Sequence, residues 1–251
     1  MENIIFFFSG TGNSLALAQE IAINLDNTEL HNMSGGFDGD LSSFERIGFI
    51  FPVYYGGVPP MVRDFIDGLK LTKSMYIFGA ITRGGMAGSA TDELVEIIEQ
   101  SGGKLSCEFT VMMPGNYIAA YGALPDFIQK TLLSKSDEKA KKITDKIKVK
   151  LIDQNLKSSR DTTPLTKKMP DFPTFAKDYR VNHNCSGCNV CAKICPSKNI
   201  TMINNKPHFD SVCQRCMACI QWCPVAAISY KGQIRARYRH PEIKAEELFR
   251  K

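Results

Sequence analysis

Short, almost continuous apolar runs alternate with amphipathic stretches over the first 155 residues. Such runs predict strands covered on both faces, as in a parallel sheet between two layers of helices. The clear runs are Ile4–Phe8, Ile47–Val53, Met75–Ile81 and Phe109–Met113, and a weaker one lies at Glu29–Met33. Strand–helix alternation of this kind predicts a right-handed, doubly wound α/β domain.

Helical spacing fills the gaps between these runs, because apolar residues recur there at every third or fourth position. The stretches are Leu15–Leu25, Val62–Leu69 after Pro59-Pro60, and Leu94–Ile98 ahead of Gly102-Gly103. A longer Lys-rich pattern from about Leu124 to Leu156 predicts a closing helix, with a break near Ser134–Asp137.

Three further segments follow. Residues 157–180 lose the periodicity and gain Pro164, Pro170 and Pro173, so we expect a linker between a domain at 1–156 and a compact domain at 181–230. Residues 231–251 are expected to form a basic tail. Charge changes near the same boundary: residues 1–155 carry 14 Lys and Arg against 19 Asp and Glu, whereas 156–251 carry 17 against 7.

Composition narrows the class of protein. The hydrophobic fraction of 43% and charged fraction of 23% exclude a disordered or fibrous chain. No stretch approaches the roughly eighteen apolar residues of a transmembrane helix. Met1-Glu2-Asn3 brings no basic region ahead of the first apolar run, so we expect no secretory signal and a cytoplasmic protein.

Eight of the nine cysteines form two copies of a C-x₂-C-x₂-C-x₃-C-P run. Three thiolates spaced in this way wrap one [4Fe–4S] cluster, whereas the fourth, followed by Pro, ligates the other cluster. The two copies are offset by 28 residues, which pairs Cys185, Cys188, Cys191 and Cys223 on one cluster and Cys213, Cys216, Cys219 and Cys195 on the other.

Structural zinc and disulfides are the alternatives for these cysteines. Zinc sites use two separated pairs around one ion, which leaves the third cysteine of each run without a role. Disulfides would join neighbours in loops too short to bridge well. The spacing resembles the bacterial two-cluster ferredoxins over about residues 181–230, and it implies a small α+β domain with two [4Fe–4S] clusters.

A loop rich in glycine and hydroxyls follows the first predicted strand. It reads Ser9-Gly10-Thr11-Gly12-Asn13-Ser14, and a helix is expected to begin within it. Such a loop offers backbone N–H groups and a positive helix end to an anion, and without Lys or Arg it suits a terminal phosphate monoester. A P-loop needs Lys after Gly12, and the dinucleotide motif needs glycine where Leu15 stands.

The loop resembles the phosphate loop of flavodoxins, and the resemblance extends over about residues 1–155. It implies a five-stranded parallel sheet in the order 2-1-3-4-5, with FMN at the carboxyl edge and its ring between the loops that follow the strands. The expected FMN-binding residues are Ser9, Gly10, Thr11, Gly12, Asn13, Ser14, Pro52, Val53, Tyr54, Tyr55, Gly56, Gly57, Thr82, Arg83, Gly84, Gly85, Gly88, Asn116 and Tyr117.

The larger domain departs from that family in lacking Trp, although many flavodoxins enclose the ring between a Trp and a Tyr. One ring face is then covered by a Tyr, left open, or occupied by the cysteine domain. A flavodoxin-like domain without flavin is the alternative to FMN binding, and core packing is a separate alternative for Tyr54 or Tyr55.

Together the two parts resemble the flavodoxin–ferredoxin fusion proteins of anaerobic microbes, which implies electron transfer. An iron–sulfur cluster accepts one electron at a time, whereas a flavin holds one or two. Placing both cofactors on one chain raises the effective concentration of each for the other. We expect electrons to pass between two [4Fe–4S] clusters and FMN, and on to redox partner proteins such as a ferredoxin, a flavodoxin or an oxidoreductase.

The alternative function is a flavin-dependent reductase of a small acceptor, such as a quinone or nitro compound, fed by the clusters. The sequence assigns no catalytic residue, because it offers no nucleophile–base pair and no nicotinamide motif. A non-redox structural protein is hard to reconcile with eight paired ligands.

The basic tail suggests how the parts associate. Arg235, Arg237 and Arg239 alternate and would share one face of an extended strand. We expect the tail to attract the acidic larger domain or an acidic redox partner, with a solvated surface tail as the alternative. No nucleic-acid motif accompanies the positive charge, and a homodimer is left open.

Two single residues complete the expectations. Cys107 is expected to pack inside a strand, and Trp222 to shield a cluster or to lie on an electron path. The four histidines are scattered and fit no ligand spacing.

Overall fold

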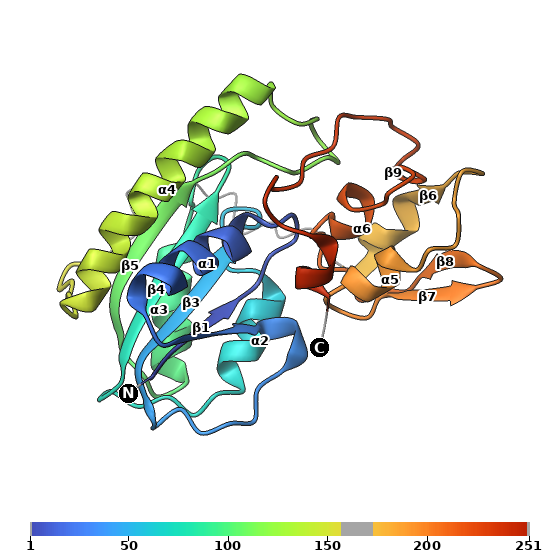
Figure 1. The fold of residues 1–251 in the computed structure, drawn as a ribbon. Coiled ribbons are helices and arrows are strands. Elements are labelled where there is room, and N and C mark those ends of the chain that lie inside the picture. Colours follow the sequence, from blue (N-terminus) through green and yellow to red (C-terminus); the bar gives the residue numbers. More distant parts are fainter. Residues whose placement is uncertain (1, 157–172, 250–251) are drawn as a thin grey trace.

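A computed structural model describes residues 2–156 and 173–249 (Figure 1). Five parallel strands form one sheet in the order β2-β1-β3-β4-β5, as the sequence predicts. The strands are β1 Glu2–Phe7, β2 Thr28–Asn32, β3 Phe44–Pro52, β4 Tyr76–Arg83 and β5 Leu105–Met112. β5 begins four residues before the predicted Phe109, because this edge strand alternates buried and partly buried positions instead of forming one apolar run.

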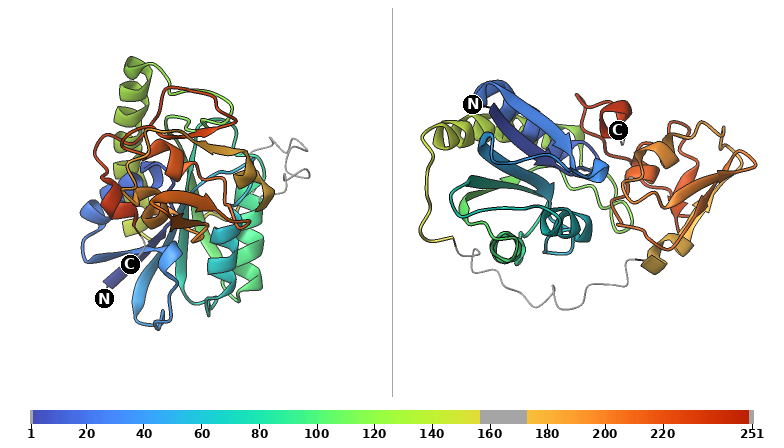
Figure 2. Two further views of the ribbon diagram at one scale, coloured as in Figure 1. Left: turned by 90° about the vertical axis from the view of Figure 1, so that its right-hand side faces the viewer. Right: turned by 90° about the horizontal axis from the view of Figure 1, so that it is seen from below.

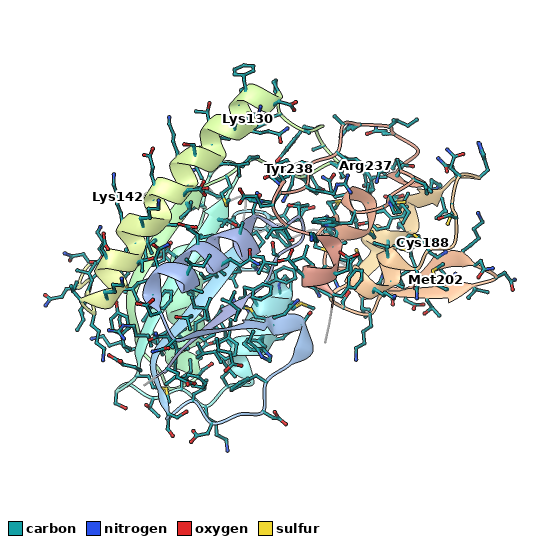
Figure 3. All side chains as sticks on the ribbon, in the orientation of Figure 1. Lys130, Lys142, Cys188, Met202, Arg237 and Tyr238 are labelled. Atoms are coloured by element: carbon teal, nitrogen blue, oxygen red, sulfur yellow. The ribbon has the colours of Figure 1, made fainter. Side chains whose placement is uncertain are left out.

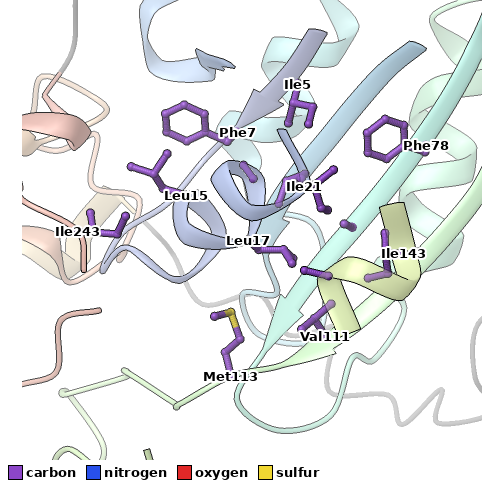
Figure 4. Close-up of a cluster of buried hydrophobic side chains, with 14 of the residues drawn as sticks. Ile5, Phe7, Leu15, Leu17, Ile21, Phe78, Val111, Met113, Ile143 and Ile243 are labelled. Atoms are coloured by element: carbon purple, nitrogen blue, oxygen red, sulfur yellow. The ribbon is translucent and has the colours of Figure 1, made fainter. Parts of the chain in front are cut away.

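Helices cover both faces of the sheet. On one face α1 (Asn13–Leu25) lies beside α4 (Asp126–Lys148), and their apolar side chains join a buried cluster with the sheet (Figure 4). On the other face α2 (Pro60–Asp67) packs beside α3 (Ala90–Gln100), and the short helix η1 spans Met33–Gly35. The sheet therefore has the covered faces that its apolar runs predict.

The break predicted near Ser134–Asp137 is wrong, since α4 is continuous. Ser136 is buried in the helix, and its hydroxyl donates to the carbonyl oxygen of Leu133 at 2.7 Å. A serine in this position satisfies its own polar group within the preceding turn, so it does not interrupt the helix.

The small domain lies beside the sheet and has two short antiparallel ribbons (Figures 1 and 2). Its elements are η3 Pro173–Asp178, β6 Tyr179–Val181, α5 Val190–Ile194, β7 Ile200–Ile203, β8 Lys206–Phe209, α6 Ala218–Gln221 and β9 Ile228–Tyr230. The expected linker is therefore wrong at its end, because residues 173–180 form η3 and the start of β6. Its remainder, 157–172, lies outside the described residues.

The C-terminal segment returns to the larger domain and ends in η4, Ala245–Leu248 (Figure 1). Tyr238 and His240 are buried, and Ile243 joins the cluster around α1 near Leu15 (Figure 4). The backbone N–H of His240 donates to the carbonyl oxygen of Thr11 at 2.9 Å. A solvated tail is therefore wrong for this segment.

The segment docks through hydrogen bonds and apolar packing and not through ion pairs between charged side chains. Tyr238 Oη donates to Asn13 Oδ1 at 2.6 Å, and no ion pair found within the described ranges joins the segment to the larger domain. The three arginines do not share a strand face. Arg235 donates to the carbonyl oxygen of Ile118 and Arg237 to that of Ile228, whereas Arg239 lies over the ring of Trp222.

No helix in the described part of the chain is long and apolar enough to cross a membrane.

Candidate functional site between the two domains

The glycine- and hydroxyl-rich loop lies where β1 ends and α1 begins. Gly12 adopts φ of 101°, a left-handed conformation that glycine accepts without strain, and this turns the chain into the helix. The backbone N–H groups of Gly10 and Thr11 make no hydrogen bond to another described residue. Two donors thus stand beside the positive end of a helix.

The hydroxyls of the loop are held in place. Ser9 Oγ accepts a 3.1 Å bond from the Gly12 N–H, and Thr11 Oγ1 accepts one from Asn116 Nδ2, so both hydroxyl protons remain available for donation. Ser14 Oγ pairs instead with Thr82 Oγ1 at 2.8 Å, which ties the loop to the end of β4.

A cavity of about 300 Å³ opens over this loop at the carboxyl edge of the sheet. Most of the residues expected to bind FMN line it: Ser9, Gly10, Thr11, Asn13, Ser14, Pro52, Val53, Tyr54, Tyr55, Gly56, Thr82, Arg83, Gly84, Gly85, Asn116 and Tyr117. Residues that follow four different strands therefore come together around one space.

Three of the expected glycines do not line this cavity, and each has a backbone role. A Cβ on Gly12 would meet His240 and Ile243, and one on Gly57 would meet the Glu93 carboxylate. Gly88, at φ of 60°, packs directly against the backbone of Gly56. The contact of these three glycines with FMN therefore stays a prediction, because none of them lines the cavity itself.

A tight hairpin forms the second wall of the cavity. Tyr54 and Gly57 exchange backbone hydrogen bonds at 3.1 and 3.0 Å, and the corner residues Tyr55 and Gly56 both have positive φ. Tyr54 is packed edge-to-face on Phe8, and burial raises its pKa. Tyr55 instead points to the small domain, and its Oη donates to Tyr117 Oη at 2.6 Å.

The eight cysteines of the repeats gather around two smaller cavities. One is lined by Cys185, Cys188, Cys191 and Cys223, and the other by Cys195, Cys213, Cys216 and Cys219. These are the two sets that the spacing predicts. Within the described ranges no three His, Cys, Asp or Glu side chains are placed to hold a single metal ion.

Comparison with protein families decides what the two parts are. The family model for the flavodoxin domain matches residues 4–83, and the model for the 4Fe-4S dicluster domain matches residues 177–236. The chain joins a flavodoxin domain to a dicluster domain. Such a fusion is an electron-transfer flavoprotein and iron–sulfur protein, with FMN and [4Fe–4S] clusters as its cofactors.

Solved flavodoxins are similar to the flavodoxin part. That of Megasphaera elsdenii, in its two-electron reduced form, is 20% identical over 55% of this chain and 98% of its own, with a TM-score of 0.38. The flavodoxin of Streptococcus pneumonia TIGR4 is 13% identical, and the match covers 60% of this chain and 100% of that flavodoxin, with a TM-score of 0.43. A mutant Fusobacterium nucleatum flavodoxin bound to flavin mononucleotide is 19% identical. The match covers 59% of this chain and 97% of that flavodoxin, with a TM-score of 0.40. No curated protein matches the chain.

The dicluster domain forms part of the cavity wall, which is one of the arrangements that the sequence left open, although the sequence did not indicate which of its residues would do so. Arg215, Cys216 and Met217 of the dicluster domain line the flavodoxin cavity, and Cys216 also lines the second cysteine cavity. A Cβ on Gly10 would lie 2.5 Å from the carbonyl oxygen of Cys216, so the two loops are in direct contact. Four other lining residues were absent from the expected set: Met86, Pro114, Gly115 and Tyr121.

Other residues of interest serve packing in the fusion. Cys107 is buried in β5 beside the Tyr76 hydroxyl, and burial raises the pKa of its thiol to about 11. Trp222 is buried, and its Nε1–H donates to the carbonyl oxygen of Gly10. It therefore packs on the phosphate loop as well as beside the cluster ligands.

Proposed function

We propose that this fusion transfers electrons within one chain between FMN and two [4Fe–4S] clusters, and between the clusters and a redox partner protein. FMN supplies a centre that holds two electrons, whereas each cluster takes one at a time. The protein supplies two groups of thiolates for the clusters and a loop for the FMN phosphate, and it holds the thiolates a short distance from that loop.

The flavodoxin cavity fits FMN in its polar groups. The N–H groups of Gly10 and Thr11 and the hydroxyls of Ser9 and Thr11 would hold the phosphate at the start of α1. The ring would then lie among the loops at 52–56, 82–85 and 116–117. Of the expected set, Gly12, Gly57 and Gly88 would support these loops from behind.

The two cysteine sets would have different positions in the path. We call the cluster of Cys195, Cys213, Cys216 and Cys219 proximal, because Cys216 also lines the flavodoxin cavity. We call the cluster of Cys185, Cys188, Cys191 and Cys223 distal. The shared residue Cys216 is the observation that carries the proposal, since it leaves no intervening side chain between one cluster and the flavin cavity.

The distal loop suits a partner. Cys188 is exposed, and Figure 3 shows it with Met202 on the part of the small domain away from the sheet. Residues 179–241 contain nine Lys and Arg and a single acid, Asp210. This excess of basic residues in the part of the chain that holds the exposed cluster loop favours a partner with an acidic surface, because complementary charge speeds encounter. A cytoplasmic location and a homodimer remain predictions.

Removing one ligand from each set tests the path. After anaerobic reconstitution, Cys223→Ala should keep electron transfer from photoreduced FMN to the remaining cluster, but lose rapid reduction by an acidic ferredoxin. Cys195→Ala should lose the transfer from FMN. Cys107→Ala, which leaves all eight ligands, should match wild type. If Cys195→Ala still transferred electrons from FMN at the wild-type rate, the proposed order of FMN, proximal cluster and distal cluster would be contradicted. A wild-type protein that takes up no FMN would contradict the function.

The reductase alternative has one favourable observation. Met86 lines the flavodoxin cavity and is 50% exposed, so this side of the site is open to solvent. Sustained turnover of a quinone or nitro compound with the clusters as electron source would support it. Transfer to proteins alone would support the carrier.

A further inference from the structure

Three bulky residues adopt left-handed backbone conformations around the flavodoxin cavity. They are Tyr55, Arg215 and Met217, with φ of 53°, 53° and 61°. For residues other than glycine and asparagine this conformation costs on the order of 1 kcal/mol each. Such strain persists where the surrounding structure holds it, and at this cavity both domains contribute to it.

The internal repeat shows that two of these residues are specific to the second copy. With the offset of 28 residues, Gly187 corresponds to Arg215 and Asn189 to Met217. Gly187 and Asn189 also have positive φ, which these residue types accept readily. The first copy faces solvent at Cys188, whereas Arg215 and Met217 in the second are buried and line the flavodoxin cavity. A strained Arg replaces a relaxed Gly only where the loop meets the cavity.

The side chain of Arg215 is held at this wall. It is 9% exposed, and its guanidinium lies 4.1 Å from the ring centroid of Phe175 and 5.5 Å from that of Tyr55. Its Nη1 donates to Tyr55 Oη at 3.2 Å, and Tyr55 Oη donates in turn to Tyr117 Oη. Both tyrosines line the cavity, so the chain of bonds runs from the cluster loop along the flavin site.

The same residue is tied to the proximal cluster. Arg215 stands between Cys213 and Cys216, and its backbone N–H donates to Cys213 Sγ at 3.3 Å. A donor to a ligating sulfur stabilises negative charge on a cluster. Among the described residues that line the flavodoxin cavity none is acidic, and Arg83 and Arg215 are the basic ones.

We propose that Arg215 is a positioning residue whose guanidinium stabilises negative charge on both the flavin and the proximal cluster, and so links their reduction potentials. This rests on the proposed function, since it requires FMN in the cavity. When the proximal cluster passes an electron to the flavin, the cluster loses one negative charge and the flavin gains one. After the second electron the flavin takes one proton from water and keeps one negative charge beside the same cation.

Anaerobic redox titration of the full reconstituted chain tests this link. In Arg215→Gln both the flavin and the proximal cluster should become harder to reduce. We expect about a tenfold change in each equilibrium, or about 30 mV for the two-electron flavin couple and about 59 mV for the one-electron cluster couple. Arg215→Lys keeps the charge and should restore most of both shifts.

Arg83→Gln is the matched control. Arg83 lines the same cavity from the end of β4, and its Nη1 donates to the carbonyl oxygen of Gly85. This variant should shift the flavin potential and leave the proximal cluster unchanged. A merely structural role for Arg215 would lower stability without moving either potential.

The outcomes separate this inference from the proposed function. Unchanged flavin and cluster potentials in Arg215→Gln with FMN bound would overturn the role of Arg215 and leave the electron-transfer function intact. Wild-type protein without FMN would overturn the function itself. If the Gln variant does not fold, Arg215→Met, whose unbranched side chain can still pack between Phe175 and Tyr55, takes its place with the same expected shifts.

Discussion

Trp222 Nε1 donates a 3.0 Å hydrogen bond to the backbone carbonyl oxygen of Gly10, and both groups are buried. Trp222 directly precedes Cys223 of the distal set, and Gly10 lies in the phosphate loop. This bond therefore joins a cysteine-rich segment of the dicluster domain to the proposed phosphate loop over a sequence separation of 212 residues. The lone Trp of the chain thus contacts this loop from the dicluster domain.

Trp222→Phe should destabilise the domain interface. The Gly10 carbonyl oxygen would lose its buried donor, which typically costs about 1–3 kcal/mol. We expect a lower free energy of unfolding and a several-fold weaker affinity for FMN, with unchanged iron and sulfide content. Denaturant unfolding and FMN titration would measure this. Equal affinity in variant and wild type would show that the bond does not shape the phosphate loop.

Gly10→Ala should separate the two redox sites. The added Cβ would lie 2.5 Å from the Cys216 carbonyl oxygen, so one loop must shift. Overpacking of this kind typically costs about 1–3 kcal/mol. The rate of electron transfer between flavin and proximal cluster should fall several-fold. In Gly68→Ala the Cβ meets only ordinary contacts at 3.5 and 3.6 Å, so this control should keep the wild-type rate.

Tyr238→Phe should weaken the contact between the C-terminal segment and the phosphate loop. Tyr238, labelled between the domains in Figure 3, donates to Asn13 Oδ1, and Asn13 Nδ2 donates to the Pro114 carbonyl oxygen at 3.0 Å. Loss of the hydroxyl leaves a buried amide oxygen without its donor, at a cost of about 1–3 kcal/mol. FMN affinity should fall together with stability.

A tyrosine outside the cavity serves as the control for that variant. Tyr230 Oη donates to Asp178 within the small domain at 3.3 Å. Tyr230→Phe should leave FMN affinity unchanged. Equal losses of affinity in the two variants would contradict a specific role for the C-terminal segment.

His240 should make docking of the C-terminal segment sensitive to acid. Burial lowers its pKa below the ordinary 6.5 in the folded protein, although Glu242 partly opposes this. The unfolded chain then binds the proton more readily, so the contribution to stability is complete above about pH 6.5 and is lost as pH falls through the lower folded-state pKa. Unfolding free energy measured against pH should show this loss in wild type and not in His240→Asn. Identical pH profiles would exclude His240 as the cause.

Patterns confined to one segment predicted their structures well. The apolar runs predicted strands that are covered on both faces, whereas the strand order followed from the resemblance to flavodoxins. The cysteine sets followed from spacing because each loop is short enough to determine its own path. The full length of β5 did not follow, since Ser106 and Glu108 interrupt its apolar run.

Contacts between the domains could not be predicted in the same way. Arg215 and Met217 line the flavodoxin cavity in a fold where the C-terminal segment and Trp222 also bind the larger domain. No local pattern marks a residue for such a contact. One signal was present in the repeat, where Gly187 and Asn189 of the first copy give way to two larger residues in the second.

Flash photoreduction of FMN in the anaerobic, fully reconstituted chain tests the central claim most directly. Because Cys216 lines both cavities, we predict that a cluster is reduced as the flavin is reoxidised, with a first-order rate constant independent of protein concentration. A rate proportional to protein concentration, or a reduced flavin that leaves the cluster absorbance unchanged, would contradict transfer within one chain.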